Sequence, residues 1–250
     1  MRRFRILSWS LLMMTLRDRS TLFWGIAFPI GLTVLYGTIT AQDQAGGVAA
    51  ISWLATGVVA LTIMASGLVG EAGHFTEMRE RGTLQRVQAT PLPPLQLVSA
   101  AMLVRLLVTL LQVVLVMAVA VVGFGAQTSA GGFAAGCVLA LLGAAVFFAI
   151  GQAIGSVAST PRAAAAIGQA LYFPLMFISN LFVPATQLPA WVAQVARFTP
   201  AYLLVDLLRP AFIPLIPTTQ AAWLDALGLA VYAVVGLALF VRFFSWAPRG

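Results

Sequence analysis

The side chains that most often carry out chemistry are scarce in this sequence of 250 residues. It has one histidine (His74), one cysteine (Cys137), seven carboxylates and no lysine, because all fourteen basic residues are arginines. The lysine of a phosphate-binding loop is therefore impossible. A histidine metal site or a serine–histidine pair has only His74 to use. We expect no catalytic residue and no metal site, and we place His74 on the surface of a loop.

The charged residues are gathered, and the densest cluster lies at residues 71–94. It contains Glu71, Glu77, Arg79, Glu80, Arg81 and Arg86. Glu77 and Arg81 are four residues apart, so they can pair on one face of a helix. Gly82 and Thr83 can end one helical turn and cap the next. A short, charged, capped element of this kind suits polar docking.

A second polar segment, rich in proline, lies at residues 184–220. Pro189 can open a short helix as its first residue, Thr199-Pro200 breaks that helix, and a second one runs to Leu208. Two such helices of about 10 residues each are too short to span a bilayer, so they would dip into one leaflet and return. Asp206 and Arg209, three residues apart, can form a pair.

Long apolar runs separate these clusters. Hydrophobic residues make up 61% of the chain and charged residues 8%, against about 45–50% and about 25% in soluble domains. A bilayer must therefore cover much of the chain. Six runs are long enough to span it as helices: Thr21–Thr40, Ala49–Gly70, Leu97–Val122, Gly131–Gly155, Ala163–Val183 and Ala226–Phe244. We predict an all-α polytopic membrane protein with six transmembrane helices in a single domain, residues 1–250.

The arginines predict the orientation, because cytoplasmic loops carry an excess of basic residues. With both termini in the cytoplasm, twelve arginines lie inside and only Arg197 and Arg209 lie outside. Arg105, within the third run, is expected at the interface with its side chain reaching outward; the alternative is a functional charge in mid-membrane. Despite the net charge of +7, no basic stripe or stacking platform indicates a nucleic-acid partner.

Two further patterns concern packing and the N-terminus. Residues 1–19 mix apolar side chains with five arginines, which predicts an amphipathic helix in the membrane plane; a frayed cationic tail is the alternative. Glycines four residues apart, at Gly132/Gly136 and Gly151/Gly155, let helices approach closely. We expect ordinary packing within the chain from them.

The charged cluster also resembles a known motif. The run Glu77-Met78-Arg79-Glu80-Arg81-Gly82-Thr83-Leu84, followed by Ala89-Thr90-Pro91, resembles the cytoplasmic-loop motif of the ABC type-2 exporter permeases. These are membrane subunits of one class of ATP-binding-cassette transporters. The outer segment is similar to the same family's pattern at Phe182-Val183-Pro184, Leu188-Pro189, Trp191, Thr199-Pro200 and Asp206 to Arg209. Thr199 stands where the family usually has asparagine. The resemblance covers nearly the whole chain.

The resemblance implies a mechanism with partners. Two permease chains, expected to be a homodimer, sit on separate ATPase subunits that bind ATP and Mg, so the chain itself holds no cofactor. Residues 71–94 would form a coupling helix that contacts the ATPase through Glu77, Arg79, Glu80, Arg81, Gly82, Thr83 and Leu84. The alternative is a solvated loop that only sets topology. The outer gate would include Phe182, Pro184, Pro189, Trp191, Pro200, Asp206 and Arg209.

The expected cargo follows from the apolar spans and their few polar groups. The first, second and fifth spans would line the path by resemblance, and its candidate residues are Gln112, Gln169, Phe177, Ser179 and Asn180. Such a path suits an amphipathic or hydrophobic molecule, such as a drug, antibiotic or lipid, exported across a bacterial or archaeal plasma (inner) membrane. The resemblance is closest to the drug-resistance branch. An exporter of lipid-linked polysaccharide, a stand-alone channel or secondary carrier, and a membrane-embedded enzyme are the alternatives.

Overall fold

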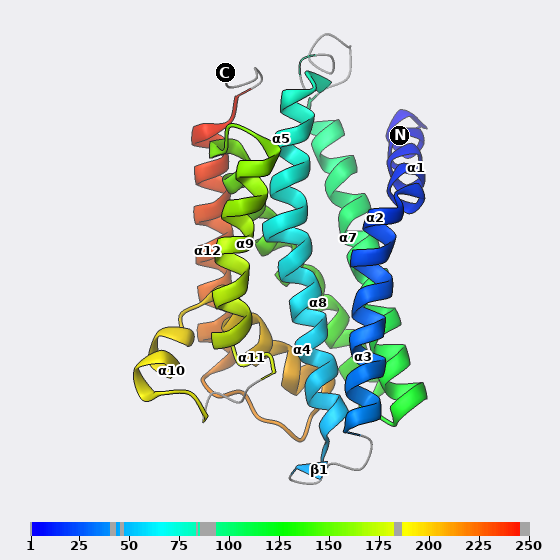
Figure 1. The fold of residues 1–250 in the computed structure, drawn as a ribbon, viewed down its shortest axis with the longest axis vertical. Helices are drawn as coiled ribbons and strands as arrows, with labels where there is room; N and C mark the ends of the chain where they lie inside the picture. Colours follow the sequence, from blue (N-terminus) through cyan, green and yellow to red (C-terminus); the bar gives the residue numbers. More distant parts are fainter. Residues whose placement is uncertain are drawn as a thin grey trace.

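A computed structural model describes residues 2–40, 44–45, 48–83, 85, 94–182 and 187–245. This part of the chain is helical apart from two short paired strands, β1 (Gln44–Ala45) and β2 (Val48–Ala49). The long helices run side by side along the long axis of the molecule (Figure 1). The predicted helical architecture is therefore confirmed.

Several of the helices are continuous through short π-helical segments. Helix α1 (Arg2–Arg17) ends before Asp18, and α2 (Arg19–Leu22), η1 (Phe23–Ala27) and α3 (Phe28–Ile39) then follow as one helix. The second joins α4 (Ala50–Met64), η2 (Ala65–Glu71) and α5 (Ala72–Glu80). Then follow α7 (Pro94–Ala118) with η3 (Val119–Gly123), α8 (Ala130–Val157), α9 (Pro161–Ile178), α10 (Ala190–Ala196), α11 (Pro200–Phe212) and α12 (Ala222–Phe243).

Local side-chain chemistry sets where three helices begin. The hydroxyl oxygens of Ser129, Thr160 and Thr199 accept hydrogen bonds from backbone N–H groups in the first turns of α8, α9 and α11, at 3.0, 3.2 and 3.3 Å. These caps satisfy donors that a helix start leaves without a partner. Proline follows the cap in α9 and α11, where its missing N–H costs nothing.

Four helices are long and apolar enough to cross a membrane: Ala50–Glu80, Ala100–Gly123, Ala130–Val157 and Ala222–Phe243. They match four of the six predicted runs. The first run forms a shorter apolar helix, Phe23–Ile39. In the fifth run, α9 ends at Ile178 instead of Val183, and Asn180 takes a left-handed backbone conformation with φ 59°. A count of six spans is thus not established by the helices alone.

The second helix corrects the predicted boundary of the charged segment. The sequence placed residues 71 onward outside the span, with His74 in a loop, whereas the helix continues without a break to Glu80. His74 therefore lies on α5. The cause is packing, because α5 is held along α8 and α9, and tertiary contacts extend a helix beyond its apolar run.

Helix α8 lies at the centre of the bundle and packs against α12, η2, α11 and α5. The expected close approach of its glycines is confirmed. A Cβ at Gly132 would meet the Ala211 carbonyl oxygen of α11, and one at Gly155 would lie 2.8 Å from the Ala72 carbonyl oxygen of α5. The predicted second outer helix exists as α11, but most of it is buried among α4, α8 and α12.

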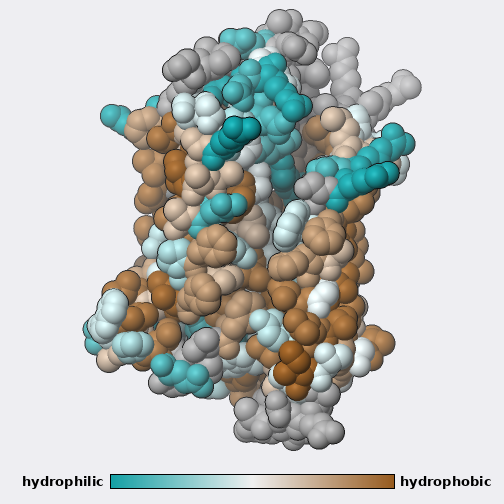
Figure 2. Space-filling view, in the orientation of Figure 1, coloured by the Kyte–Doolittle hydropathy of each residue, from teal (hydrophilic) through white to brown (hydrophobic). Residues whose placement is uncertain are grey.

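The ends of the bundle differ in polarity. The start of α1, the end of α5 and the end of α12 lie together at one end, whereas β1, α10 and α11 lie at the other (Figure 1). Figure 2 shows hydrophilic residues gathered near the α5 end and hydrophobic residues over the sides of the helices. An apolar belt with a polar end fits a protein whose sides contact lipid.

Candidate functional site

The charged cluster of the sequence forms the end of α5, which projects from the bundle (Figure 1). Arg81 N–H donates to the Glu77 carbonyl at 2.9 Å, and Gly82 N–H donates to the Arg79 carbonyl at 3.1 Å. Gly82 has φ 65°, a left-handed conformation that glycine adopts without steric cost. The predicted helix end at Gly82 is therefore confirmed.

The outer face of this end carries opposite charges. Glu77 Oε1 and Arg81 Nη2 form an ion pair at 2.6 Å, with side chains 42% and 74% exposed. Glu80 is exposed, and Gly82 and Thr83 are half-buried. An exposed ion pair of this type contributes about 0.3–0.5 kcal/mol to stability. Glu77 or Arg81 can therefore leave this pair and form an ion pair with a charge on another protein at little cost. Leu84 lies outside the described residues.

Arg79 differs from its neighbours because it is only 1% exposed. Its Nη1 donates to the Ser156 carbonyl at 3.1 Å, and its Nη2 donates to the Ala158 carbonyl. These carbonyls lie at the C-terminus of α8, where a helix has unpaired acceptors and a negative dipole end. The expectation that Arg79 faces a partner does not fit this structure, because the guanidinium is used inside the chain.

Other contacts hold α5 to the same neighbours. Thr76 Oγ1 donates to the Gly155 carbonyl of α8 at 3.1 Å. The ring of Phe75 packs against Phe240 and Phe244 at the end of α12, with centroids 5.3 and 6.0 Å apart. The exposed charges of α5 are thus carried on a helix that is fixed to α8 and α12.

Replacing Arg79 by methionine is expected to destabilise the purified chain. The change leaves two buried carbonyl oxygens without donors, and a hydrogen bond to a charged group contributes about 1.5–3 kcal/mol. The matched control is Arg81→Met, whose exposed side chain should change stability by about 0.5 kcal/mol or less. Thermal unfolding in detergent measures both, and equal midpoints for the two variants would contradict the burial of Arg79.

At the opposite end, Arg209 of α11 is buried under α4 and α9. It is 2% exposed, its guanidinium carbon lies 3.2 Å from the ring centroid of Trp53, and Nη2 donates to the Leu181 carbonyl at 3.1 Å and to the Asn180 carbonyl. Burial lowers the pKa of Arg209 to about 9, so it is still cationic at neutral pH. Arg209 therefore holds the end of α9 in place.

The predicted pair of Asp206 with Arg209 is wrong. Asp206 accepts the Thr219 backbone N–H at 2.9 Å and the Gln220 N–H at 3.3 Å. Among the described residues, ion pairs join Glu77 to Arg81 and Glu71 to Arg105. The spacing of three on α11 allowed a pair, but the loop before α12 supplies nearer donors.

The other residues assigned to the outer gate are spread over this end. Phe182 packs on Tyr36 of α3, with ring centroids 5.4 Å apart. Trp191 is 71% exposed, Pro189 caps α10, and Pro200 is buried at the start of α11. Pro184 lies outside the described residues. Of the gate residues that the structure describes, Phe182 thus lies against the first apolar helix.

The proposed path residues do not share one surface. Gln112, Ser179 and Asn180 are 4%, 0% and 6% exposed, and the Ser179 hydroxyl lies 3.1 Å from that of Thr199. Phe177 is 61% exposed and Gln169 is exposed, both on α9. An apolar cavity of about 440 Å³ exists, but other residues line it, from α7, α8, α11 and α12. Of the five assigned path residues, Gln169 and Phe177 are therefore the exposed ones, and both lie on α9.

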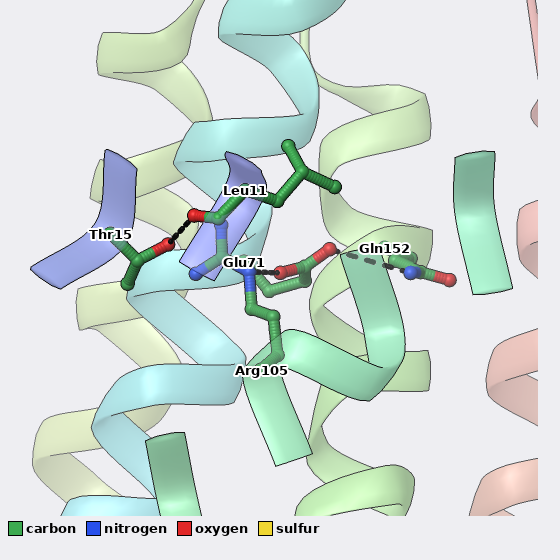
Figure 3. Close-up of polar contacts among 5 residues, drawn as sticks. All are labelled: Leu11, Thr15, Glu71, Arg105 and Gln152. Carbon is green, nitrogen blue, oxygen red and sulfur yellow. Dashed lines mark hydrogen bonds and ion pairs between the residues drawn. The ribbon is translucent and has the colours of Figure 1, made fainter. Parts of the chain in front are cut away.

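The sequence reasoning missed a partly buried polar cluster. Glu71, at the junction of η2 and α5, pairs with Arg105 of α7 at 2.8 Å and accepts a hydrogen bond from Gln152 of α8 at 3.4 Å (Figure 3). Arg105 was expected to reach outward at the interface, and the structure instead turns it toward Glu71. The available signal was two opposite charges at the inner ends of consecutive apolar runs.

A comparison with protein families gives one match over most of the chain. The model of the ABC-2 type transporter family matches residues 2–213, which include the charged end of α5 and the outer helices α10 and α11. A comparison with curated proteins found no match. A match of this extent, on a bundle of apolar helices, shows that the chain belongs to the ABC-2 type transporter family.

Proposed function

We propose that the chain is the transmembrane subunit of an ATP-driven exporter and that the end of α5 is where a separate ATPase docks. Membership in the family makes the chain a membrane permease, a non-catalytic subunit that itself binds no nucleotide. Permeases of this family generally pair with an ATP-binding-cassette ATPase. In this chain we propose that the end of α5 contacts the ATPase and that the cargo moves outward.

The observation that carries the docking proposal is the exposed charge on a rigidly anchored helix end. Glu77, Glu80 and Arg81 lie on the outside, whereas Arg79 and Thr76 bind α8. A partner that grips the outer charges can therefore move the bundle instead of bending a loose loop. We assign the contact to Glu77, Glu80, Arg81, Gly82, Thr83 and Leu84, and we give Arg79 the role of an internal anchor.

The arrangement in the membrane is part of the same proposal. Six spans with both termini in the cytoplasm would put α1, the α5 end and the α12 end on the cytoplasmic side, and these segments lie at one end of the bundle (Figure 1). The excess of arginines on that side supports its placement in the cytoplasm, and the membrane we propose is a bacterial or archaeal plasma (inner) membrane. Helix α1 would lie in the membrane plane, a second copy of the chain would complete the path as a homodimer, and residues 184–220 would form the outer gate.

The cargo proposed is an amphipathic or hydrophobic molecule, such as a drug, antibiotic or lipid. Support comes from α9, where Phe173 and Phe177 are 53% and 61% exposed on a helix that also carries Gln169. The alternative is an exporter of lipid-linked polysaccharide that works by the same mechanism. A stand-alone channel or secondary carrier would move cargo without an ATPase, so purified chain alone in vesicles separates it from the exporter.

Reversing both outer acids, as Glu77→Arg with Glu80→Arg, is expected to remove the ATPase from the purified complex. Like charges brought together at an interface cost several kcal/mol, so retained ATPase should fall by about tenfold or more. The test isolates the tagged full-length chain from its native membranes and quantifies the co-purified protein that carries a phosphate-binding loop. Arg197→Glu, at the opposite end, is the control. Unchanged assembly in the double variant, with unchanged unfolding temperature, would refute the docking surface.

A further inference from the structure

Glu71 and Arg105 form an ion pair on the two helices that enter and leave the segment 81–93. Arg105 Nε lies 2.8 Å from Glu71 Oε2, and the side chains are 27% and 10% exposed for Arg105 and Glu71. The other carboxylate oxygen accepts from Gln152 Nε2 at 3.4 Å (Figure 3). Both charges lie inside candidate membrane spans, Ala50–Glu80 and Ala100–Gly123. The pair thus joins α7 to the junction of η2 and α5.

Stability alone does not account for this pair. Taking two charges out of water costs several kcal/mol per ion, and apolar side chains of similar volume are often as stable in their place. Apolar packing already holds α4 against α7. An intramembrane pair that the fold does not need for cohesion points to a role in function.

The position of the pair indicates that role. Glu71 lies ten residues before Arg81, and Arg105 lies eleven residues after Pro94. With a rise of 1.5 Å per residue, each is about 15 Å along its helix from the segment 81–93. The pair therefore connects the two arms of one hairpin at equal depth.

The two arms share α8 as a neighbour but differ in their other contacts. Helix α5 is bound to α8 and α12 through Thr76, Arg79 and Phe75. Helix α7 packs on α4, α8 and α1, and Leu11 and Thr15 of α1 appear beside the pair in Figure 3. The contacts of α7 therefore include α1, which these anchors of α5 do not reach, and the ion pair adds a polar link between the two arms.

We propose that Glu71 and Arg105 are positioning residues that tie the two arms of the α5–α7 hairpin into one unit. A displacement imposed on the segment 81–93 then moves α7 and α5 together, and both sides of the bundle respond. The inference rests on the proposed function, because it requires a partner that moves this segment. Gln152 holds the second carboxylate oxygen, which keeps Glu71 aimed at α7.

The test needs a variant that loses the link and keeps the fold. Glu71→Gln combined with Arg105→Gln leaves no unpaired charge, so we expect it to fold and to bind the ATPase as the unchanged chain does. Glu71→Arg with Arg105→Glu exchanges the charges and restores an ion pair. Arg162→Gln removes an exposed arginine at the start of α9 and is the control.

Motion of α7 can be followed without knowing the cargo. Cys137→Ala removes the natural thiol, and Leu107→Cys on α7 with Leu239→Cys on α12 adds two labels at exposed positions. Spin-label distances are measured in the reconstituted permease–ATPase complex, with and without ATP, alongside ATP hydrolysis. We expect an ATP-dependent change of distance in the unchanged chain, in the Arg162→Gln control and in the charge-exchanged variant. We expect hydrolysis without that change in the neutral double variant.

The outcomes separate this inference from the proposed function. If the unchanged chain neither binds the ATPase nor responds to ATP, the proposed function fails. If it responds and the neutral double variant responds equally, only the inference is overturned. A folded charge-exchanged variant that does not recover the response would overturn the ion pair as the link. Where that variant does not fold, as judged by size-exclusion chromatography, the neutral double variant decides alone.

Discussion

Replacing Gly151 by alanine is expected to lower the unfolding temperature markedly, although the change adds a single methyl group. A Cβ at this position would meet the carbonyl oxygen of Gly67 and lie 3.2 Å from Glu71 Cβ. The carbonyl oxygen belongs to the helix backbone, so relief requires α8 to move away from η2. Overpacking of this kind costs about 1–3 kcal/mol and sometimes more, which exceeds the gain of about 0.5–1 kcal/mol from replacing glycine in a helix.

The same helix offers a matched control for Gly151→Ala. A Cβ at Gly131 would meet nothing within 4 Å, so Gly131→Ala should leave the unfolding temperature unchanged or raise it. Both variants are purified in the same detergent, and unfolding is followed by intrinsic fluorescence. If the two midpoints agree, α8 and η2 are not in backbone contact, and the central packing of the bundle described above is wrong.

Replacing Arg209 by methionine is the second change with a large expected effect. The variant leaves the carbonyl oxygens of Asn180 and Leu181 without their buried donor and removes the cation from the face of Trp53. A hydrogen bond to a charged group contributes about 1.5–3 kcal/mol, and a desolvated cation–π contact about 2 kcal/mol. We therefore expect a loss of several kcal/mol, seen as a lower unfolding temperature.

Two comparisons isolate the cause of the Arg209→Met effect. Arg197→Met removes an exposed arginine after α10 and should change little. Trp53→Leu, alone and combined with Arg209→Met, completes a double-mutant cycle, in which residues in contact show an interaction energy of about 0.5–3 kcal/mol. Strict additivity of the two changes would show that the contact of Arg209 with Trp53 contributes nothing.

The contacts of Gly151 and those of Arg209 lie at different levels of the bundle. Together they limit which helices can move relative to one another. Gly151 keeps α8 against η2, next to Gln152 and Glu71. Arg209 keeps the end of α9 and the helix α4 around α11. A permease must change shape during transport while its subunit holds together. The close backbone contact at Gly151 and the buried cation of Arg209 hold neighbouring helices together, and an ion pair links α5 to α7. These contacts are consistent with a bundle that moves as a few rigid parts.

Much of the fold is predictable from the sequence because its causes are local. Runs such as Ala49–Gly70 and Gly131–Gly155 are too apolar for any medium but lipid, and their backbone must then be helical to satisfy its own hydrogen bonds. The Glu77–Arg81 pair and the helix end at Gly82 were also predicted, since both depend on residues within one turn. Family membership agrees with the motif around these residues.

The fates of the remaining charges were not predictable, because they depend on residues distant in the sequence. Arg79 and Arg81 are two residues apart in the same motif, yet one is buried against α8 and the other is exposed. Arg105 was expected to reach toward water, and Asp206 was expected to pair within α11. Their actual partners are Glu71, 34 residues away, and the backbone at Thr219.

By itself, the sequence determined that this chain is a helical membrane protein with one charged end, because hydropathy and short-range spacing act through the local chain. Only the tertiary structure decided which charges of that end face outward, which anchor α5 to α8, and which link α5 to α7. A buried charge takes whichever donor or acceptor the packed helices bring within hydrogen-bonding distance, since leaving it unpaired in a medium without water costs more than any local preference supplies.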